Sequence, residues 1–313
     1  LVQVLKYEPY HDSPLVRFLL RRALAQKDIV GGVLFWHLRA EIHVPEISIR
    51  FQLLIEAYLR GCGSVYRTTI VDQVRLLSDF TDVAQRLVDL ENDKRMPYLR
   101  SALGTQRFPA RFTLPLFTDF ECSGVTVQRC RFMRSKKMPL WLEFKNADID
   151  GPAVTVLYKV GDDLRQDELT LQMLRIMDKL WKRHKFHLHM SPYAVKATGK
   201  DMGLLEVVPD SETTGSINRE AGGARQVLNE ATITNWLQRH NAGDVAYQQA
   251  ARRFALSCAG YCVFTYVLGI GDRHNDNVML TRDGKLFHID FGHFLGNFKK
   301  KFGFDREKAP FVF

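Results

Sequence analysis

The spacing of apolar residues changes twice along this chain of 313 residues. Up to residue 103, apolar side chains recur at intervals of three and four, which predicts amphipathic helices. Between residues 125 and 208, β-rich runs and one period-two alternation predict strands. The helical spacing returns from Asn218 to Val267. This order predicts an α+β fold, in which a helical segment precedes a sheet-bearing region and a second, mainly helical region.

The first part of the chain is predicted to be helical throughout. Gly31-Gly32 and Pro45 are expected to separate its helices, which would form antiparallel pairs like those of an α-solenoid. About two such units are too few for an independent solenoid, so we expect the end of a larger helical domain. A polar-faced helix over residues 66–103 is expected to act as a connector. The first three helices are expected over Leu15–Ala25, Gly32–Ile42 and Arg50–Arg60.

The middle of the chain contains the predicted strands. The first of them alternates with period two, and the others are short β-rich runs. A long amphipathic helix is expected before the last strand, over Leu164–His184. The strands themselves are expected over Val125–Met133, Pro139–Phe144, Ala153–Val160 and Met202–Val208.

Composition favours a globular protein with an anionic partner. Hydrophobic residues make up 46% of the chain and charged residues 25%, and the formal net charge is +9. A basic chain of this kind favours a nucleotide, an anionic lipid headgroup or nucleic acid as its partner. The five cysteines form no CxxC pair and have no metal-ligand spacing, so free thiols in a reducing compartment are expected.

Two segments bear on membrane insertion. The N-terminus lacks a basic region followed by an apolar core, so no secretory signal is predicted. Phe254–Gly271 contains 18 residues without a charge, close to the lower limit for crossing a bilayer. The same segment contains Ser257, Thr265, two tyrosines and three glycines. A fully buried helix followed by a strand is therefore favoured over a transmembrane helix.

The segment GIGDRHNDNVMLTRDGKLFHIDFGH carries a pattern suited to phosphoryl transfer. Asp272 precedes Asn277 by five positions, and Asp290 opens an Asp-Phe-Gly triplet. Protein kinases place their metal ligands and their hydroxyl-orienting carboxylate with this spacing, although the usual HRD is reversed here to DRH. Asn277 and Asp290 offer the oxygen ligands that Mg²⁺ prefers. They would flank a hairpin formed by residues 278–280 and 286–289.

Two further basic side chains are candidate contacts of the reacting groups. A neutral His274 could accept the proton of the substrate hydroxyl, or a charged His274 could stabilise the developing phosphate charge. Lys159 ends a predicted strand, from which it can pair with the α- or β-phosphate of a nucleotide. Asp163 and Asp167 are expected to anchor this lysine from the following helix. His288 is expected to be structural.

Two basic segments complete the candidate site. Arg131–Pro139 lies between predicted strands, where the phosphate-covering loop of a kinase belongs. It contains no glycine, so Ser135, Lys136 and Lys137 would contact phosphates through their side chains. His293–Lys308 has a net charge of +3, and three consecutive lysines favour an anionic acceptor such as a phosphorylated lipid headgroup. The basic residues of that segment are Lys299, Lys300, Lys301, Arg306 and Lys308.

With these residues in place, the chain resembles class I phosphoinositide 3-kinase catalytic subunits. The resemblance rests on GDRHNDN, HIDFGHFLGNFKKKFG, GDDLRQD, LWLEF and SCAGYC, and it covers essentially the whole chain. It implies a bilobal, protein-kinase-like lipid kinase domain with an antiparallel-sheet N-lobe and a mainly helical, truncated C-lobe, preceded by part of an α-solenoid helical domain. The implied boundaries are 1–69 for the helical domain, 70–112 for connector helices, 113–208 for the N-lobe and 209–313 for the C-lobe.

The resemblance also implies roles for individual residues. Asn277 and Asp290 would bind Mg²⁺. Asp272 and His274 would act on the inositol 3-hydroxyl, with His293 beside the transferred phosphate. The residues around ATP would be Ser135, Lys137, Trp141, Leu157, Lys159, Asp167, Tyr193, Glu206, Val208, Met279 and Ile289.

The implied activity is ATP-dependent phosphorylation of the 3-hydroxyl of phosphatidylinositol 4,5-bisphosphate, or of a less phosphorylated phosphoinositide. Lys299–Lys301 would select the headgroup. Asp305–Lys308 carries an acid where the family commonly has a basic or polar residue, so bisphosphate and monophosphate acceptors stay open. The other functions considered are a phosphatidylinositol 4-kinase, a PI3-kinase-like serine/threonine kinase, and an inactive fragment that binds nucleotide or a partner.

The expected setting is the cytoplasm, with peripheral recruitment to an anionic phosphoinositide membrane surface and no nucleic-acid partner. A regulatory or adaptor subunit and a Ras-type GTPase are expected partners of a full-length protein. The adaptor-binding, Ras-binding and C2 regions of such a protein are absent from this sequence.

Overall fold

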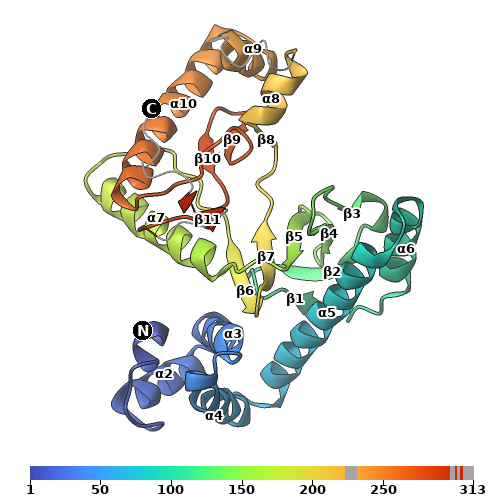
Figure 1. The fold of residues 1–313 in the computed structure, drawn as a ribbon, viewed down its shortest axis with the longest axis vertical. Helices are drawn as coiled ribbons and strands as arrows, with labels where there is room; N and C mark the ends of the chain where they lie inside the picture. Colours follow the sequence, from blue (N-terminus) through green and yellow to red (C-terminus); the bar gives the residue numbers. More distant parts are fainter. Residues whose placement is uncertain (223–230, 297–299, 302–303, 306–313) are drawn as a thin grey trace. The chain divides into compact units, whose positions relative to one another are not determined.

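A computed structural model describes residues 1–222, 231–296, 300–301 and 304–305 of the chain (Figure 1). The chain divides into two compact units. The first comprises Leu1–Glu168 and Ala194–Val207, and the second comprises Leu169–Tyr193 together with the chain from Val208 onward. The mixed α+β class predicted from the sequence is confirmed.

The first unit begins with the predicted helices. As predicted, Pro45 marks a helix boundary: one helix ends at Glu41, and Pro45 lies in the first turn of the next, where the missing N–H of proline has no intrahelical partner to lose. Gly31-Gly32 does not separate two helices, because Gly31 ends a short π-helical turn (Lys27–Gly31) that runs directly into the next helix at Gly32. The four α-helices are α1 (Val2–Leu5), α2 (Pro14–Ala25), α3 (Gly32–Glu41) and α4 (Pro45–Gly61).

The single polar-faced helix predicted over residues 66–103 is two helices, α5 (Ser64–Asp89) and α6 (Asn92–Thr105). The buried face of α5 packs against the sheet of the first unit, where the ring of Phe80 lies 6.1 Å from that of Phe144 and 6.0 Å from that of Tyr158. The Thr81 and Tyr158 hydroxyl groups are 2.7 Å apart. This helix therefore ties the N-terminal helices to the sheet.

The sheet of the first unit is antiparallel, with strand order β1-β2-β4-β5-β7-β6 and β3 paired with β4 (Figure 1). The predicted strands over Pro139–Phe144, Ala153–Val160 and Met202–Val208 are confirmed as β4, β5 and β7. The strands are β1 (Phe112–Thr113), β2 (Glu121–Val125), β3 (Arg131–Phe132), β4 (Leu140–Asn146), β5 (Val154–Val160), β6 (Val195–Gly199) and β7 (Met202–Glu206).

The prediction of one strand over Val125–Met133 is wrong. The chain leaves β2 at Val125, forms a short 3-10 helix over Val127–Arg129 and re-enters the sheet as β3. The Cys130 N–H donates to the Thr126 carbonyl at 3.2 Å and closes this corner. Buried residues on both sides of a corner produce the same alternation as a strand, so the pattern cannot separate the two.

The second unit consists mainly of helices, as predicted. The long predicted helix is α7 (Arg165–Arg183), whose first turn belongs to the first unit. The predicted hairpin is confirmed, with Leu286 opposite Leu280, and β8 joins it in a three-stranded sheet. The other elements are β8 (Ser211–Thr213), α8 (Thr214–Glu220), α9 (Ala231–His240), α10 (Asp244–Val267), β9 (Val278–Thr281), β10 (Leu286–His288), β11 (Lys300–Lys301) and β12 (Phe304–Asp305).

The uncharged stretch Phe254–Gly271 lies in α10 and the turn after it. None of the helices that the structure describes has the length and apolar character needed to cross a membrane. The helix is not fully buried as predicted, because Val263, Tyr266 and Val267 are exposed. No strand follows it directly either, since β9 begins only at Val278. All five cysteines are free, as expected.

Candidate active site

The catalytic motif folds as an irregular loop in the second unit. Asp272 and Asp290 both have positive φ angles, +54° and +59°. L-residues reach this left-handed region at a cost of roughly 1–2 kcal/mol each. Backbone strain of this kind persists only where surrounding contacts fix the conformation. The contacts around Asp272 and Asp290 therefore determine whether the loop can keep this conformation.

Arg273 supplies these contacts, and sequence reasoning missed it. Its Nε donates to the Gly271 carbonyl at 2.9 Å and its Nη1 to the Ile289 carbonyl at 2.8 Å, while Nη2 donates to the Asp290 carbonyl. The side chain is only 9% exposed. One guanidinium thus joins the loop before Asp272 to the loop that carries Asp290. Its position between two candidate catalytic residues was the available signal.

Asn277 is oriented by the same loop. Its Nδ2 donates to the Asp272 backbone carbonyl at 2.8 Å, and the backbone carbonyl of Asn277 accepts the Ile289 N–H at 3.0 Å. Because the NH₂ group is used in this bond, Oδ1 is the atom that a metal ion would meet. The residue is 7% exposed.

The donor set near Asn277 and Asp290 fits Mg²⁺. The described part of the chain contains no group of three or more His, Cys, Asp or Glu side chains that could hold a metal ion. Mg²⁺ usually takes one or two carboxylate ligands from a protein and completes its shell with phosphates and water. An amide oxygen and one carboxylate therefore suit a metal that arrives with a nucleotide.

The two histidines of the motif have different environments. His274 is exposed, and its Nδ1 accepts the Asp276 N–H at 3.2 Å. His293 is 4% exposed, and its Nε2 lies 3.8 Å from Oδ2 of Asp272. The carbonyl of His293 also accepts the Gly271 N–H at 3.0 Å. His293 is thus built into the loop beside Asp272, whereas His274 faces solvent.

His288 lies in the core of the second unit, in agreement with a structural role. Its ring stacks on that of Tyr261 with centroids 5.1 Å apart and an interplanar angle of 5°. Burial lowers the pKa of His288 to about 3, with a smaller contribution from Arg273. The imidazole is therefore neutral at physiological pH.

Three predicted nucleotide residues share one face of the sheet in the first unit. Trp141 pairs with Leu157 across β4 and β5, and Lys159 follows Leu157 by two positions on the same face. Gly203 of β7 lies opposite Lys159. A Cβ at Gly203 would lie 2.3 Å from the Lys196 carbonyl oxygen, so only glycine fits beside the lysine. Arg131, which was not predicted as a pocket residue, places its guanidinium 4.2 Å from the Trp141 ring centroid.

The expectation that Asp163 anchors Lys159 is wrong. Asp163 pairs instead with Arg165, at 2.9 Å from Nε and 2.7 Å from Nη2. The hydrogen bond from Arg165 holds the pKa of Asp163 below its usual value, although partial burial opposes this. Asp167 is buried in the first turn of α7.

The predicted phosphate loop is held by its own lysine. Lys137 donates to the Gly161 carbonyl and to the Asp162 carboxylate, which joins the loop to the end of β5. The Ser135 N–H donates to the Met133 carbonyl at 2.9 Å. A nucleotide phosphate would have to compete with Asp162 for the Lys137 ammonium.

The remaining nucleotide candidates divide between the units. One unit boundary runs between Val207 and Val208, beside the candidates Glu206 and Val208. Glu206 ends β7 in the first unit, and its carboxylate accepts the Ala194 N–H at 2.7 Å. In the second unit, Met279 lies in β9 opposite Phe287. The other candidates there are the buried Tyr193, Val208, whose carbonyl accepts the Ser211 hydroxyl at 2.8 Å, and Ile289, which follows β10.

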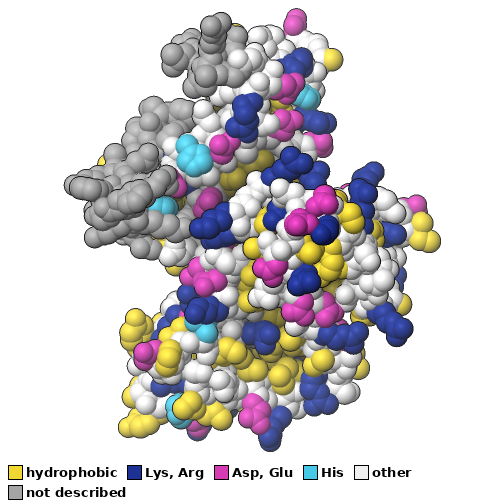
Figure 2. Space-filling view, turned by 45° about the vertical axis from the view of Figure 1, so that its right-hand side comes forward, with side chains coloured by type: hydrophobic (Ala, Val, Ile, Leu, Met, Phe, Trp, Pro, Cys, Tyr) yellow, Lys and Arg dark blue, Asp and Glu magenta, His cyan; other side chains and the backbone are white. Residues whose placement is uncertain are grey.

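The basic segment after the Asp-Phe-Gly triplet is described only in part. Lys300 and Lys301 form β11, whose backbone pairs with Asp305 and Phe304 of β12. Lys299, Arg306 and Lys308 lie outside the described residues. Elsewhere, Lys and Arg side chains are interspersed with acidic ones on the face that Figure 2 shows.

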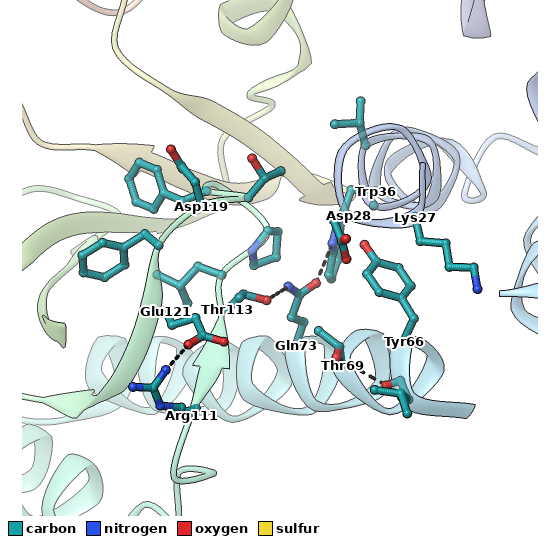
Figure 3. A pocket seen from close by; sticks show the side chains of 18 of the residues that line it. Lys27, Asp28, Trp36, Tyr66, Thr69, Gln73, Arg111, Thr113, Asp119 and Glu121 are labelled. Carbon is teal, nitrogen blue, oxygen red and sulfur yellow. Dashed lines mark hydrogen bonds and ion pairs between the residues drawn. The ribbon is translucent and has the colours of Figure 1, made fainter. Parts of the chain in front are cut away.

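A cavity of about 940 Å³ lies in the first unit (Figure 3). It is bordered by α3, the start of α5 and the segment around β1. Trp36 Nε1 donates to Oε1 of Gln73 at 3.1 Å, and Gln73 Nε2 donates to the Thr113 hydroxyl at 2.9 Å. Its lining, within the described residues, includes none of the predicted site residues.

Comparison with known families agrees with this arrangement. The family model described as phosphatidylinositol 3- and 4-kinase matches residues 153–313, slightly more than half of the chain. The chain belongs to this family. A second model, the accessory (PIK) domain of the phosphoinositide 3-kinase family, matches residues 1–70. The predicted resemblance is thereby confirmed, and the phosphoinositide kinase family explains why an accessory helical region precedes the sheet.

Similar proteins carry the same family name. Over the full length of this chain, the sequence is 50% identical to phosphatidylinositol 3-kinase 1 of Dictyostelium discoideum, and the match covers 20% of that relative. Phosphatidylinositol 3-kinases 2 and 3 of the same organism are 50% and 45% identical and are covered to 17% and 18%. The chain therefore spans about a fifth of the length of these relatives.

Proposed function

We propose that this chain is the catalytic part of an ATP-dependent phosphoinositide 3-kinase. Its acceptor would be the 3-hydroxyl of phosphatidylinositol 4,5-bisphosphate or of a less phosphorylated phosphoinositide. The observation that carries the proposal is the Arg273 clamp, which fixes Asp272 and Asp290 within one loop system together with Asn277. The relatives named phosphatidylinositol 3-kinase support the choice of lipid and ring position.

ATP would be bound by the nucleotide residues predicted from the sequence. In the first unit Trp141 and Leu157 would contact the base and Lys159 the phosphates, since they share one face of the sheet. Lys137 and Ser135 would bind phosphate from the neighbouring loop after release of Asp162. The other proposed contacts are Asp167, Tyr193, Glu206, Val208, Met279 and Ile289.

Mg²⁺ would be held by Oδ1 of Asn277 and the carboxylate of Asp290. When bound with ATP, the ion would neutralise charge on the phosphates during transfer. The protein contributes the fixed orientation of the two ligands. Arg273 determines the backbone position of Asp290, and the Asp272 carbonyl determines which way the Asn277 amide points.

The hydrogen bonds support different tasks for Asp272 and His274. Nδ1 of His274 accepts the Asp276 N–H, so the neutral ring carries its proton on Nε2. In that form His274 is a donor to a phosphate oxygen and not a base. Asp272 then accepts the proton of the 3-hydroxyl as its oxygen bonds to the γ-phosphorus and the bond to the β–γ bridging oxygen breaks. His293, 3.8 Å from Asp272, would stabilise that carboxylate beside the transferred group.

The acceptor would be bound at a membrane surface. Lys299, Lys300 and Lys301 would contact the headgroup phosphates, with Arg306 and Lys308 nearby in sequence. Basic residues near an anionic membrane contribute about 1 kcal/mol each. The proposed setting is the cytoplasm with peripheral recruitment, and a full-length protein would also bind an adaptor subunit and a Ras-type GTPase. The proposed domain boundaries are 1–69, 70–112, 113–208 and 209–313, in keeping with family matches over 1–70 and 153–313.

The proposal is tested by turnover of the full-length protein on vesicles that contain phosphatidylinositol, its 4-phosphate or its 4,5-bisphosphate. We expect a new phosphate at the 3-position of the ring and loss of turnover in Lys159→Met. Product at the 4-position would replace the proposal with a 4-kinase. Transfer only to a protein substrate would replace it with a protein kinase, and ATP binding without transfer would leave a nucleotide-binding module.

A further inference from the structure

The accessory helix α3 ends in a buried acid that reaches the kinase part of the first unit. Glu41 is 5% exposed, and its two carboxylate oxygens have different partners. Oε1 accepts from Lys6 Nζ at 2.7 Å, and Oε2 accepts from Arg165 Nη1 at 2.7 Å. Burial disfavours the charged carboxylate, yet Lys6 and Arg165 together hold the pKa of Glu41 below its usual value. The acid is therefore ionised and committed to these two cations.

Arg165 is the first residue of α7, and it binds Asp163 as well as Glu41. While Nη1 binds Glu41, its Nε and Nη2 bind the two oxygens of Asp163 at 2.9 and 2.7 Å. The Arg165 N–H also donates to Asp163 at 3.1 Å. The guanidinium is planar and rigid, so two carboxylates on opposite edges fix its orientation. The start of α7 is thereby tied to the end of α3.

A second contact joins the same helices three residues further along α7. Glu168 receives Lys196 of β6 on Oε1, and the Ala197 N–H donates to its Oε2 at 3.2 Å. Nε2 of His37 lies 3.6 Å from Glu168 Oε1. His37 and Glu41 are four residues apart, on one face of α3. That face therefore holds Arg165 and Glu168, the two residues on either side of Gln166–Asp167.

Helix α3 is itself fixed from another direction. Trp36 donates to Gln73 of α5, and Gln73 donates to Thr113 of β1 (Figure 3). The helix is thus anchored to α5 and the sheet through Trp36 before it reaches α7 through His37 and Glu41. Because α3 is held at Trp36 and again at His37 and Glu41, the position of α3 determines the position of the start of α7.

We infer that the accessory domain forms part of the nucleotide site: Glu41 is a positioning residue that acts through Arg165 to place Asp163–Asp167. This inference rests on the proposed function, since Asp167 is a proposed ATP contact. Glu41 does not itself lie among the proposed ATP contacts. Loss of its charge would weaken the bond from α3 to Arg165, which lies between Asp163, just before α7, and Asp167 in its first turn.

The inference predicts an effect on ATP and none on the lipid. In the full-length protein, Glu41→Gln should raise the KM for ATP and the Kd for Mg-ATP roughly tenfold, since small displacements of positioning groups have effects of this order. The KM for the phosphoinositide should not change. The conservative variant Glu41→Asp, which keeps the charge, should recover part of the loss, which a purely structural role would not predict.

Two control variants isolate the relay. Glu56→Gln removes an exposed accessory-helix acid that pairs only within α4, with Arg60 at 2.5 Å. Lys6→Met removes the other cation bound to Glu41 and keeps the bond of Glu41 to Arg165. Both should bind Mg-ATP as the unmodified protein does. Thermal unfolding identifies any variant that fails to fold, and Arg165→Gln then serves as the second test from the kinase side of the contact.

The direct Mg-ATP titration separates this inference from the proposed function. A protein without lipid kinase activity that still loses affinity for Mg-ATP in Glu41→Gln would contradict the proposed function and support the relay. A folded Glu41→Gln protein whose Mg-ATP affinity stays within twofold of the unmodified protein would overturn the relay. Equal losses in Glu41→Gln and Lys6→Met would also overturn it, because they would show a general packing effect.

Discussion

The two units hold their functional residues in different ways. In the first unit, separate side-chain pairs join the elements, among them Glu41 of α3 with Arg165 of α7 and Thr81 of α5 with Tyr158 of β5. In the second unit, one side chain, Arg273, binds three backbone carbonyls around the candidate catalytic loop. Separate contacts tolerate the loss of one member, whereas a loop with strained aspartates depends more on a side chain that makes three of its hydrogen bonds. The comparison predicts where substitutions have large effects.

The largest effect is expected for Arg273→Lys. A lysine ammonium cannot reproduce the guanidinium fork, so at least one of the three carbonyls would be left buried without its donor. We expect the free energy of unfolding to fall by about 3 kcal/mol and kcat to fall roughly 100-fold. Because Asp290 is the displaced ligand, part of the lost rate should return at high Mg²⁺ concentration. Chemical denaturation and a Mg²⁺ titration of lipid turnover measure both quantities.

The matched control for this substitution is Arg253→Lys. Arg253 lies in the same unit but makes one hydrogen bond to a backbone carbonyl, that of Asp283 at 3.1 Å. Its replacement should change the free energy of unfolding by about 1 kcal/mol or less and leave kcat unchanged. Equal losses of stability and kcat in the two variants would mean that Arg273 contributes no more than an arginine with one bond to a backbone carbonyl.

The pH dependence of stability provides a second comparison of the two units. The unfolded chain protonates His288 near pH 6.5, whereas the folded pKa is about 3, so the unfolded state binds more protons between these values. Stability should therefore fall as pH falls below 6.5, by about 3 kcal/mol at pH 4.5. Glu41 has a lowered folded pKa, so its contribution in the first unit is lost only below pH 4.5, the value of an unperturbed glutamate.

Denaturation of the His288→Phe variant between pH 4.5 and pH 7.5 measures the histidine contribution. The slope of stability against pH should flatten relative to the unmodified protein, whatever the absolute stability of the variant. His184→Phe, which replaces an exposed histidine, should keep the original slope. An unchanged slope in His288→Phe would refute the assignment of a neutral imidazole to the core.

The smallest effect is expected where α5 meets the sheet. Tyr158→Phe removes the hydroxyl that lies 2.7 Å from Thr81 and donates to the Leu77 carbonyl at 3.2 Å. We expect a loss of about 1 kcal/mol in the free energy of unfolding and no change in kcat. The double variant with Thr81→Val should lose less than the sum of the two single variants. A tenfold fall in kcat in Tyr158→Phe would show that this contact is not merely one of many.

The sequence predicted elements whose residues repeat with a regular period. The helices over Leu15–Ala25 and Leu164–His184, the strand over Ala153–Val160 and the catalytic hairpin all form close to their predicted bounds. Burial on one face imposes such periods directly on the sequence. Strand β6 was missed, because its five residues are nearly all buried and show no alternation.

The contacts that hold the site could not be predicted in this way. The guanidinium of Arg273 binds the carbonyls of Ile289 and Asp290, which any residue type at those positions would offer. Asp163 lies near Lys159 in sequence but pairs with Arg165. Arg165 in turn binds Glu41, which lies more than 100 positions earlier. Contacts to the backbone and across long separations leave no period in the sequence.

The central claim is that Asp272, Asn277 and Asp290 transfer the γ-phosphate of ATP to a phosphoinositide 3-hydroxyl. The most direct measurement is 3-phosphorylated lipid formed per second by full-length Asp290→Asn, beside its free energy of unfolding. We predict a loss of roughly 1000-fold in kcat, the scale of one essential electrostatic group, with unfolding changed by less than about 0.5 kcal/mol. A folded variant that retains more than a tenth of the original turnover would contradict the claim.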